Sequence, residues 1–334
     1  MKICVVGAGA IGGFLAVKLA AAGHEVSVVI RGAHLAAVRQ HGLRFIGEDG
    51  ATLAQPVVAT DRIADLGAQD VVILGMKAHQ VAAVAAELPR LFGPDTTVVT
   101  TQNGIPWWYF QKLPGPWQGR AIEAVDPGGV IAGHIPVERV IGCVVYPACD
   151  LPEPGVVRQI EGNRFPLGEI DGSDTPRLRA LVEAFRAAGF KSPVLSDIRS
   201  EIWLKLWGNL SFNPISALTH ATLEEICTHE GTRALARTMM LEAQAIGEKL
   251  GVRFKIDVDR RIAGAQAVGA HKTSMLQDVE TGRAMELGAL VQSVIELGRI
   301  TGTPTPAIEQ VHALAALLAQ SLGKARGRLR IESS

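Results

Sequence analysis

The feature that most constrains this chain is a glycine-rich turn directly after its first apolar run. In a strand, turn and helix of this kind the first glycine permits a tight turn, the second lets the backbone approach a phosphate, and the third allows close packing of the helix. The first N–H groups of the helix then face an anion. Glycines of an unrelated turn are the alternative. The pyrophosphate site that the turn predicts comprises Gly7, Ala8, Gly9, Ala10, Ile11 and Gly12.

The first third of the chain alternates short apolar runs with helical stretches. Residues 11–22 are predicted to form a helix, and the runs predicted to form strands are 3–6, 26–30, 71–74 and 96–101. This alternation is typical of parallel βαβ units. Residues 140–146 and 156–160 are predicted to be two further strands that extend the same sheet.

From about residue 197 the strand signals stop, and long helical patterns follow at roughly 202–212, 231–250, 274–299 and 306–321. The expected fold class is therefore α/β, with an N-terminal Rossmann-type parallel-sheet domain followed by an all-α C-terminal domain. We place the first domain at residues 1–195 and the second at residues 196–330. The last residues, 326–334, are expected to be a frayed tail.

Composition excludes several classes of protein. Lys and Arg together number 33, as do Asp and Glu, so no net field attracts nucleic acid or an acidic membrane surface. The four cysteines have no paired spacing, which favours reduced thiols and a cytoplasmic protein. No membrane span is expected, because nowhere do about 18 apolar residues follow one another without a charge.

Arg31 stands where the second predicted strand ends, at the position that distinguishes the two nicotinamide cofactors. NAD sites usually carry an acidic residue there, which binds the ribose hydroxyls. No Asp or Glu occurs between Val26 and Gly47. A guanidinium suits a 2′-phosphate better than a 2′-hydroxyl, so we expect NADP(H). The alternative is a solvated arginine at a strand end.

Two polar signals follow later strands of the predicted sheet. Lys77 comes after the apolar run 71–76, and Asn103 comes after the run 96–101. Ligands of open parallel sheets bind beyond the carboxyl ends of the strands, so both side chains could face the nicotinamide. The alternatives are an ordinary Asn-Gly turn and a lysine whose ammonium simply reaches water.

Residues 202–213 form a helix that is apolar almost all round and carries one polar stripe. At about 100° per residue, Lys205, Asn209 and Asn213 fall within an arc of roughly 80°. A buried helix with such a stripe should point it at a ligand, because a buried ammonium needs an anionic or polar partner. The alternative is an edge helix whose three polar residues meet water.

The predicted helix at 274–299 offers a second candidate stripe. Glu286, Leu290, Val294 and Leu297 follow one another at helical steps, which places a carboxylate on the inward face. Ser274 begins the helix with the spacing of a capping box, so an N-cap is its simplest interpretation. A cap at a helix end that faces a site can also bind a ligand.

Taken together, these motifs resemble the ketopantoate reductase (2-dehydropantoate 2-reductase) family over nearly the whole chain. The resemblance rests on the order and spacing of several short motifs. They are the glycine turn at 7–12, Gly75-Met76-Lys77-Ala78, Gln102-Asn103-Gly104, Lys205 with Asn209 and Asn213-Pro214, and Ser274-Met275-Leu276-Gln277-Asp278 with Glu286 twelve residues after the serine.

The resemblance implies an NADP-dependent oxidoreductase that acts on CH–OH groups and reduces 2-dehydropantoate, a small 2-oxo acid, to pantoate on the route to coenzyme A. Lys205 would protonate the new hydroxyl oxygen, and Glu286 would anchor the cleft and contact the cofactor. The implied substrate contacts are Asn103, Asn209, Asn213 and Ser274. The further implied cofactor contacts are Arg31, Lys77, Asn103 and the backbone around Ala148. No metal is implied, and a homodimer is the assembly to test for.

The chain departs from the family pattern in three places. Leu223 and His271 stand where the family often has asparagines, and the segment at 107–110, Trp-Trp-Tyr-Phe, is longer and more aromatic. A paralogue that reduces a bulkier or more apolar 2-oxo acid is therefore the rival enzyme. A non-catalytic protein that senses NADP(H) is the alternative from another class, although it would have no use for an inward lysine.

Overall fold

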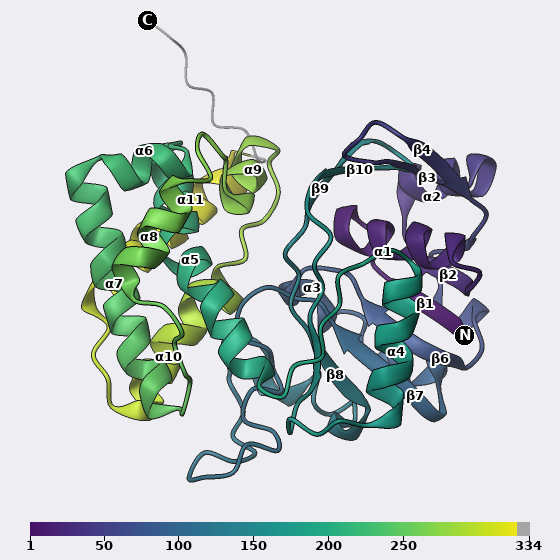
Figure 1. Ribbon diagram of the computed structural model, residues 1–334, viewed down its shortest axis with the longest axis horizontal. Coiled ribbons are helices and arrows are strands. Elements are labelled where there is room, and N and C mark those ends of the chain that lie inside the picture. Colours follow the sequence, from purple (N-terminus) through teal and green to yellow (C-terminus); the bar gives the residue numbers. More distant parts are fainter. Residues whose placement is uncertain (326–334) are drawn as a thin grey trace, which may run out of the picture. The chain divides into compact units, whose positions relative to one another are not determined.

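A computed structural model describes residues 1–325, which divide into two compact units (Figure 1). The first unit comprises Met1–Ala121 and Asp126–Ile198. The second comprises Ile122–Val125 and the described chain from Arg199 onward. The sequence prediction had a single boundary after residue 195, whereas the chain enters the second unit briefly at residues 122–125 as well. The predicted tail at 326–334 and the predicted domain end at 330 lie outside the described residues.

A seven-stranded sheet lies at the centre of the first unit. Its order is β11-β8-β7-β6-β1-β2-β5, and every neighbouring pair is parallel except β11 with β8. The strands are β1 Lys2–Val6, β2 Glu25–Val29, β5 Val58–Thr60, β6 Gln69–Leu74, β7 Phe92–Thr100, β8 Val140–Cys143 and β11 Leu167–Glu169. The predicted α/β class with a parallel N-terminal sheet is confirmed, and the strand predicted from residue 140 belongs to this sheet.

A second, four-stranded sheet was not predicted. Its order is β4-β3-β10-β9, with β3 parallel to β10 and the other two pairs antiparallel. The strands are β3 Leu43–Ile46, β4 Thr52–Gln55, β9 Ala148–Glu153 and β10 Val156–Glu161. The prediction that residues 156–160 extend the main sheet is therefore wrong. The apolar pattern of a strand indicates that it pairs but not with which partner.

The helix that follows the glycine turn, α1 (Ala10–Ala21), packs against both sheets. It contacts β1 and β2 of the main sheet and all four strands of the second one. Phe14 of α1 stacks on Phe45 of β3 with ring centroids 5.2 Å apart. A Cβ at Gly13 would come within 2.6 Å of Val157 on β10, so a glycine is needed for this close approach. Burial on two sides explains why α1 is apolar apart from Lys18.

The remaining α-helices of the first unit are α2 Gly32–His41, α3 Ala78–Val81 and α4 Pro176–Ala187. Of these, α2 contacts β5 and β3, and α4 contacts β11 and α1. The aromatic segment at 107–110 is buried, and the Trp108 indole N–H donates to the Thr100 hydroxyl at 3.0 Å. This segment therefore fills the core of the first unit beside the end of β7.

The described part of the second unit is all helical. A π-helical turn, Gly288–Gln292, precedes α10. The α-helices are α5 Ile198–Thr219, which starts at the boundary, α6 Leu223–Thr228, α7 Glu230–Lys249, α8 Val258–Gln266, α9 Ser274–Glu280, α10 Ser293–Thr301 and α11 Pro306–Lys324. No helix within residues 1–325 is long and apolar enough to cross a membrane.

Two predicted helices have different bounds in the structure. The helix predicted at 202–212 runs to Thr219, because the buried residues after Pro214 keep it helical despite the missing N–H of the proline. The single helix predicted at 274–299 is wrong. It ends at Glu280, and Gly282 follows with φ +68°, a left-handed conformation typical of a helix end.

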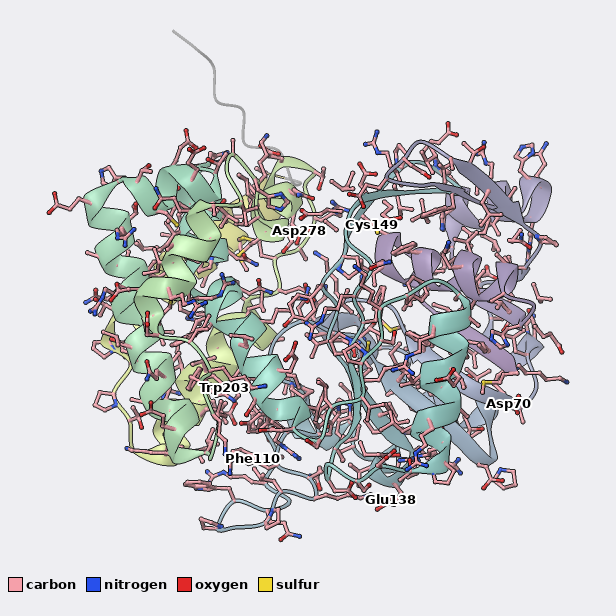
Figure 2. The ribbon with its side chains drawn as sticks, in the orientation of Figure 1. Asp70, Phe110, Glu138, Cys149, Trp203 and Asp278 are labelled. Carbon is pink, nitrogen blue, oxygen red and sulfur yellow. The ribbon has the colours of Figure 1, made fainter. Side chains whose placement is uncertain are left out.

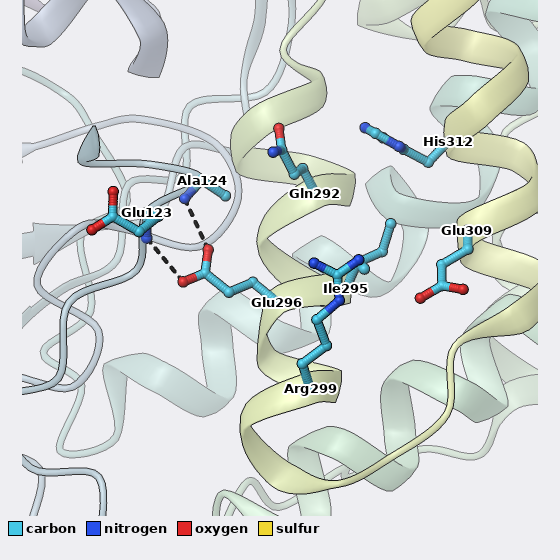
Figure 3. Close-up of a pocket in the computed structure, with 8 residues that line it drawn as sticks. All are labelled: Glu123, Ala124, Gln292, Ile295, Glu296, Arg299, Glu309 and His312. Atoms are coloured by element: carbon cyan, nitrogen blue, oxygen red, sulfur yellow. Dashed lines mark hydrogen bonds between the residues drawn. The ribbon is translucent and has the colours of Figure 1, made fainter. Parts of the chain in front are cut away.

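Residues 122–125 belong to the second unit because α10 holds their backbone. The Glu296 carboxylate accepts hydrogen bonds from the N–H groups of Glu123 and Ala124, each at 2.9 Å (Figure 3). Beside this contact is a pocket of about 630 Å³, whose lining includes Arg299 of α10 and His312 of α11. The pair of charge-assisted hydrogen bonds anchors this crossing segment.

Candidate functional site

The glycine turn joins β1 to α1 and is shaped by main-chain contacts. Gly7 has φ +87°, and a Cβ there would lie 2.8 Å from the backbone nitrogen of Met76. A Cβ at Gly12 would collide with the Gly7 carbonyl oxygen. A Cβ at Gly9, in contrast, would meet nothing within 4 Å. Gly7 and Gly12 are therefore required by the packing of the turn itself, whereas Gly9 borders open space.

The first turn of α1 carries the hydrogen-bonding groups expected of a phosphate site. Gly9 is the N-cap, no side chain caps the helix, and its first turn contains no acidic residue. The first N–H groups of a helix have no intrahelical partner, and the helix dipole places partial positive charge there. Together with the open space at Gly9, this end of α1 fits an anionic phosphate.

Arg31 lies at the same edge of the sheet as the glycine turn. It follows β2, which is the parallel neighbour of β1, and is the N-cap of α2. Its side chain is exposed, and the first turn of α2 likewise lacks an acidic residue. A guanidinium beside an uncapped helix start is a favourable place for a second anion. The local geometry thus fits a 2′-phosphate.

Lys77 and Asn103 follow the carboxyl ends of the adjacent strands β6 and β7. Lys77 is the N-cap of α3, and its N–H donates to the Gln80 side-chain oxygen at 3.2 Å. The Gln102 amide donates to the carbonyls of Leu74 and Met76 at 2.6 and 3.1 Å, which ties the two loops together. Lys77 and Asn103 are both half-buried. They therefore extend the same edge of the sheet beyond the glycine turn.

Ala148 has a different structural setting from the other candidate cofactor contacts. It is the first residue of β9 in the second sheet. Its position is fixed by pairing with Glu161 of β10 and by the packing of β9 on α1. The neighbouring Cys149 is half-buried, and burial raises the pKa of its thiol to about 12. This thiol is therefore protonated and poorly nucleophilic at neutral pH.

In the second unit, α5 carries the predicted polar stripe. Lys205 and Asn209 are half-buried, and Asn213 is only 4% exposed. The other faces of α5 are packed by aromatic side chains, among them the buried Trp203 (Figure 2). The Trp207 indole N–H donates to the Met240 carbonyl at 2.6 Å. The rotation of α5 is thus fixed by buried tryptophans, which sets the direction of the stripe.

The structure brings Asn213 and Ser274 together. The Asn213 side-chain amide donates to the Ser274 hydroxyl at 3.3 Å. The N-cap of α9 is Thr273, whose hydroxyl accepts from the Leu276 N–H at 3.2 Å. The interpretation of Ser274 as the N-cap is therefore wrong. Because Thr273 caps the helix, the exposed Ser274 hydroxyl is held by Asn213 at the end of the stripe.

Glu286 lies outside any helix, contrary to the prediction that it starts an inward helical stripe. It immediately precedes the turn that leads into α10, and its carbonyl accepts from the Leu290 N–H at 3.2 Å. The three apolar members of the predicted stripe, Leu290, Val294 and Leu297, are buried as expected. The half-buried Glu286 side chain is thus presented from a helix start.

The two substitutions relative to the family pattern lie side by side in the second unit. The Leu223 N–H donates to the His271 carbonyl at 3.0 Å, which joins the start of α6 to the segment before α9. His271 is two residues before Thr273, the N-cap of α9, and this hydrogen bond brings the start of α6 next to that segment. Within residues 1–325, no group of three or more His, Cys, Asp and Glu side chains is arranged to hold a metal ion.

One side chain that was not predicted from the sequence contacts the glycine turn. The ring of His34, in the first turn of α2, places Nε2 2.9 Å from the Ala8 carbonyl oxygen. The only sequence signal was its position three residues after Arg31. A lone histidine on a short helix does not identify a partner 26 residues earlier in the chain.

Two family models match the chain. The model described as "Ketopantoate reductase PanE/ApbA" matches residues 3–108, and the one described as "Ketopantoate reductase PanE/ApbA C terminal" matches residues 197–319. The chain belongs to the ketopantoate reductase family. The resemblance inferred from the motifs is thereby confirmed.

Individual relatives and solved structures are similar to this chain over nearly its full length. The 2-dehydropantoate 2-reductase of Mesorhizobium japonicum is 58% identical over 324 residues, which cover 97% of this chain and 99% of that protein. A solved structure from Ralstonia solanacearum has a TM-score of 0.92 at 45% identity, covering 96% of this chain and 98% of that one. D-mandelate dehydrogenase, solved with NADH and anilino(oxo)acetate, shares the fold with a TM-score of 0.81 at 20% identity, over 97% and 100% of the two chains.

Proposed function

We propose that this ketopantoate reductase family member catalyses the NADPH-dependent reduction of 2-dehydropantoate to pantoate, a step of pantothenate and coenzyme A biosynthesis, in the cytoplasm. The observation that carries the proposal is the polar stripe of α5, which ends at the hydrogen bond between Asn213 and Ser274. It stands in a chain that is 58% identical to the Mesorhizobium japonicum 2-dehydropantoate 2-reductase. A homodimer is the expected assembly, which light scattering would test.

The residues around the glycine turn fit a dinucleotide phosphate. The uncapped start of α1 offers N–H groups, and Gly9 leaves room beside them. Bound NADPH would supply the hydride that reduces the ketone carbon. The choice of NADPH over NADH is supported by Arg31 and by the lack of an acidic residue in α2. The proposed cofactor contacts are Gly7, Ala8, Gly9, Ala10, Ile11, Gly12, Arg31, Lys77, Asn103, Ala148 and Glu286.

Lys205 is the proposed acid. Its ammonium would polarise the ketone carbonyl and donate a proton to the oxygen as negative charge develops there. The carbonyl thereby becomes an alcohol, with the hydride on carbon and the lysine proton on oxygen, and water would then reprotonate the amine. Asn209, Asn213 and Ser274 offer amide and hydroxyl groups suited to the substrate's hydroxyl and carboxylate.

A second candidate is the reduction of another 2-oxo acid on the same machinery. Leu223 and His271 stand where the family often has asparagines, and D-mandelate dehydrogenase, of the same fold, has been solved with anilino(oxo)acetate. Steady-state kinetics with NADPH would compare 2-dehydropantoate with other branched and aromatic 2-oxo acids. The proposal predicts the highest kcat/KM for 2-dehydropantoate. Negligible turnover of 2-dehydropantoate beside a good rival substrate would reject it.

A further inference from the structure

His34 connects three segments of the first unit that are far apart in the sequence. It lies in the first turn of α2, and its Nε2 is 2.9 Å from the Ala8 carbonyl oxygen in the glycine turn. On the other side of the ring, Nδ1 is 2.8 Å from the backbone nitrogen of Gly155, in the turn between β9 and β10. One imidazole thus spans the glycine turn, α2 and the second sheet.

The two contacts fix the protonation of the ring. A backbone N–H can only donate, so Nδ1 carries the lone pair that accepts from Gly155. Nε2 therefore carries the proton and donates to the Ala8 carbonyl. Burial lowers the pKa of His34, opposed by the hydrogen bond to Ala8, so the ring is neutral at pH 7. The charged groups on the adjoining elements include Arg31 and Arg39 on α2, the ion pair of Arg44 with Glu153, 3.2 Å apart, and the ion pair of Arg158 with Asp150.

The segment that holds Nδ1 is itself closely fitted to α2. Gly155 has φ +80°, and a Cβ there would lie 2.9 Å from Cβ of Ala37. The Gly155 carbonyl accepts from the Arg44 N–H of β3 at 2.9 Å. Since this turn contacts both α2 and β3, it holds the Gly155 N–H in a fixed position beside the imidazole.

We propose that His34 is a positioning residue for the dinucleotide. Its Nε2–H holds the Ala8 carbonyl and so keeps the first N–H groups of α1 in the orientation that receives a phosphate. Because His34 lies one turn after Arg31, the same bond fixes the guanidinium-bearing end of α2 relative to the glycine turn. This proposal rests on the proposed function of that turn, and it assigns the second sheet a part in cofactor binding.

Two near-isosteric variants separate the contacts of the ring. Glutamine in His34→Gln can extend an N–H to the Ala8 carbonyl, whereas asparagine in His34→Asn can present an oxygen to Gly155 but is too short to reach Ala8. Fluorescence titration would use whichever of NADPH and NADH the wild type binds more tightly. We expect His34→Gln to bind within about threefold of wild type, and His34→Asn and His34→Ala to bind about tenfold more weakly, the loss expected for one partly buried hydrogen bond.

Measuring turnover distinguishes a residue that positions the cofactor from one that takes part in the chemical step. At saturating cofactor, kcat should stay within about twofold of wild type in all three variants, because the ring donates nothing to the reacting atoms. His41→Ala, an exposed histidine at the end of the same helix, is the matched control and should leave binding unchanged. NMR of the ring nitrogens should find Nδ1 unprotonated and Nε2 protonated at pH 7.

Several results would overturn the proposal. Equal affinity in His34→Gln and His34→Asn, with a change only in melting temperature, would make His34 a purely structural residue. A ring protonated at Nδ1 would contradict the assigned contact with Ala8. If the wild type bound neither dinucleotide, the proposed function would fail together with this inference, whereas normal wild-type binding with no effect of any variant would reject the inference alone.

Discussion

The glycine turn and the polar stripe of α5 are built in opposite ways. At the turn, the groups that could bind a ligand are main-chain N–H groups, and the glycines contribute by having no side chain that would fill the space or collide with the backbone. Along α5 the main chain is occupied by the helix, and the polar groups are the side chains of Lys205, Asn209 and Asn213. Adding one carbon to a glycine of the turn should therefore impair ligand binding or folding there, whereas removing polar atoms from a side chain of the stripe should impair catalysis or substrate binding.

The largest expected effect is at the stripe. Lys205→Ala should lower kcat by about 10³-fold, because the general acid and the polarising charge are lost together. Binding of NADPH should change by less than about twofold. Stopped-flow and steady-state assays would measure turnover, and fluorescence titration would measure binding. Lys324→Ala, at the exposed end of α11, is the control. Unchanged turnover in Lys205→Ala would remove this lysine from the mechanism and leave a dinucleotide-binding protein without an identified acid.

At the turn, two glycines should respond differently to one added methyl group. Gly9→Ala should weaken dinucleotide binding by about 10- to 100-fold while leaving the melting temperature nearly unchanged, because its Cβ meets only the space where the phosphate would lie. Gly12→Ala should instead lower the free energy of unfolding by about 1–3 kcal/mol through its collision with the Gly7 carbonyl. Thermal denaturation and titration on both variants would test this. Equal losses of stability in Gly9→Ala and Gly12→Ala would show that the two glycines do not have different roles.

Arg31 combines features of both regions. It offers a charged side chain, as the stripe does, and it stands beside a helix start without a side-chain cap, as the turn does. Arg31→Ala should weaken NADPH binding by about 10- to 30-fold through loss of a charge-assisted hydrogen bond, and NADH binding by less than about twofold. Arg39→Ala, at the other end of α2, is the matched control. Parallel titrations with the two cofactors give the ratio directly. Equal losses for NADPH and NADH would refute a 2′-phosphate contact.

The smallest expected effect concerns the hydrogen bond at the end of the stripe. Asn213→Ala and Ser274→Ala should each raise KM for the 2-oxo acid several-fold. The free-energy loss in the double variant should be smaller than the sum of the losses in the two single variants. A coupling energy of about 1 kcal/mol is expected for a single hydrogen bond. A double-mutant cycle on kcat/KM would measure it. Strict additivity would mean that the two side chains act separately.

The parts of the site that sequence analysis predicted depend on local geometry. Gly7 to Gly12 belong to one strand, turn and helix, and Arg31 directly follows the neighbouring strand. The stripe from Lys205 to Asn213 needs only the helical repeat. Each of these features is determined within about a dozen residues, so periodicity and spacing suffice to locate it.

The features that were missed depend on distant contacts or on competition between neighbours. Strand β10 pairs with β3, where Val156 lies opposite Arg44, more than a hundred residues earlier. Thr273 and Ser274 are both good capping residues, and the spacing alone did not decide between them. α5 continues past Pro214 because packing outweighs the cost of proline, about 3 kcal/mol in a helix interior. His34 needed the folded positions of Ala8 and Gly155 to be recognised.

The burial of α1 between two sheets has a consequence for how the chain is made. The glycine turn and α1 are synthesised between β1 and β2, the main-sheet strands that α1 contacts. The other side is completed by β10, which ends at Glu161. Until that residue has been synthesised, the outer face of α1, including Phe14, lacks part of its cover. The apolar surface of α1 is thus synthesised more than a hundred residues before its cover is complete, and apolar surface left exposed on a growing chain is prone to aggregate.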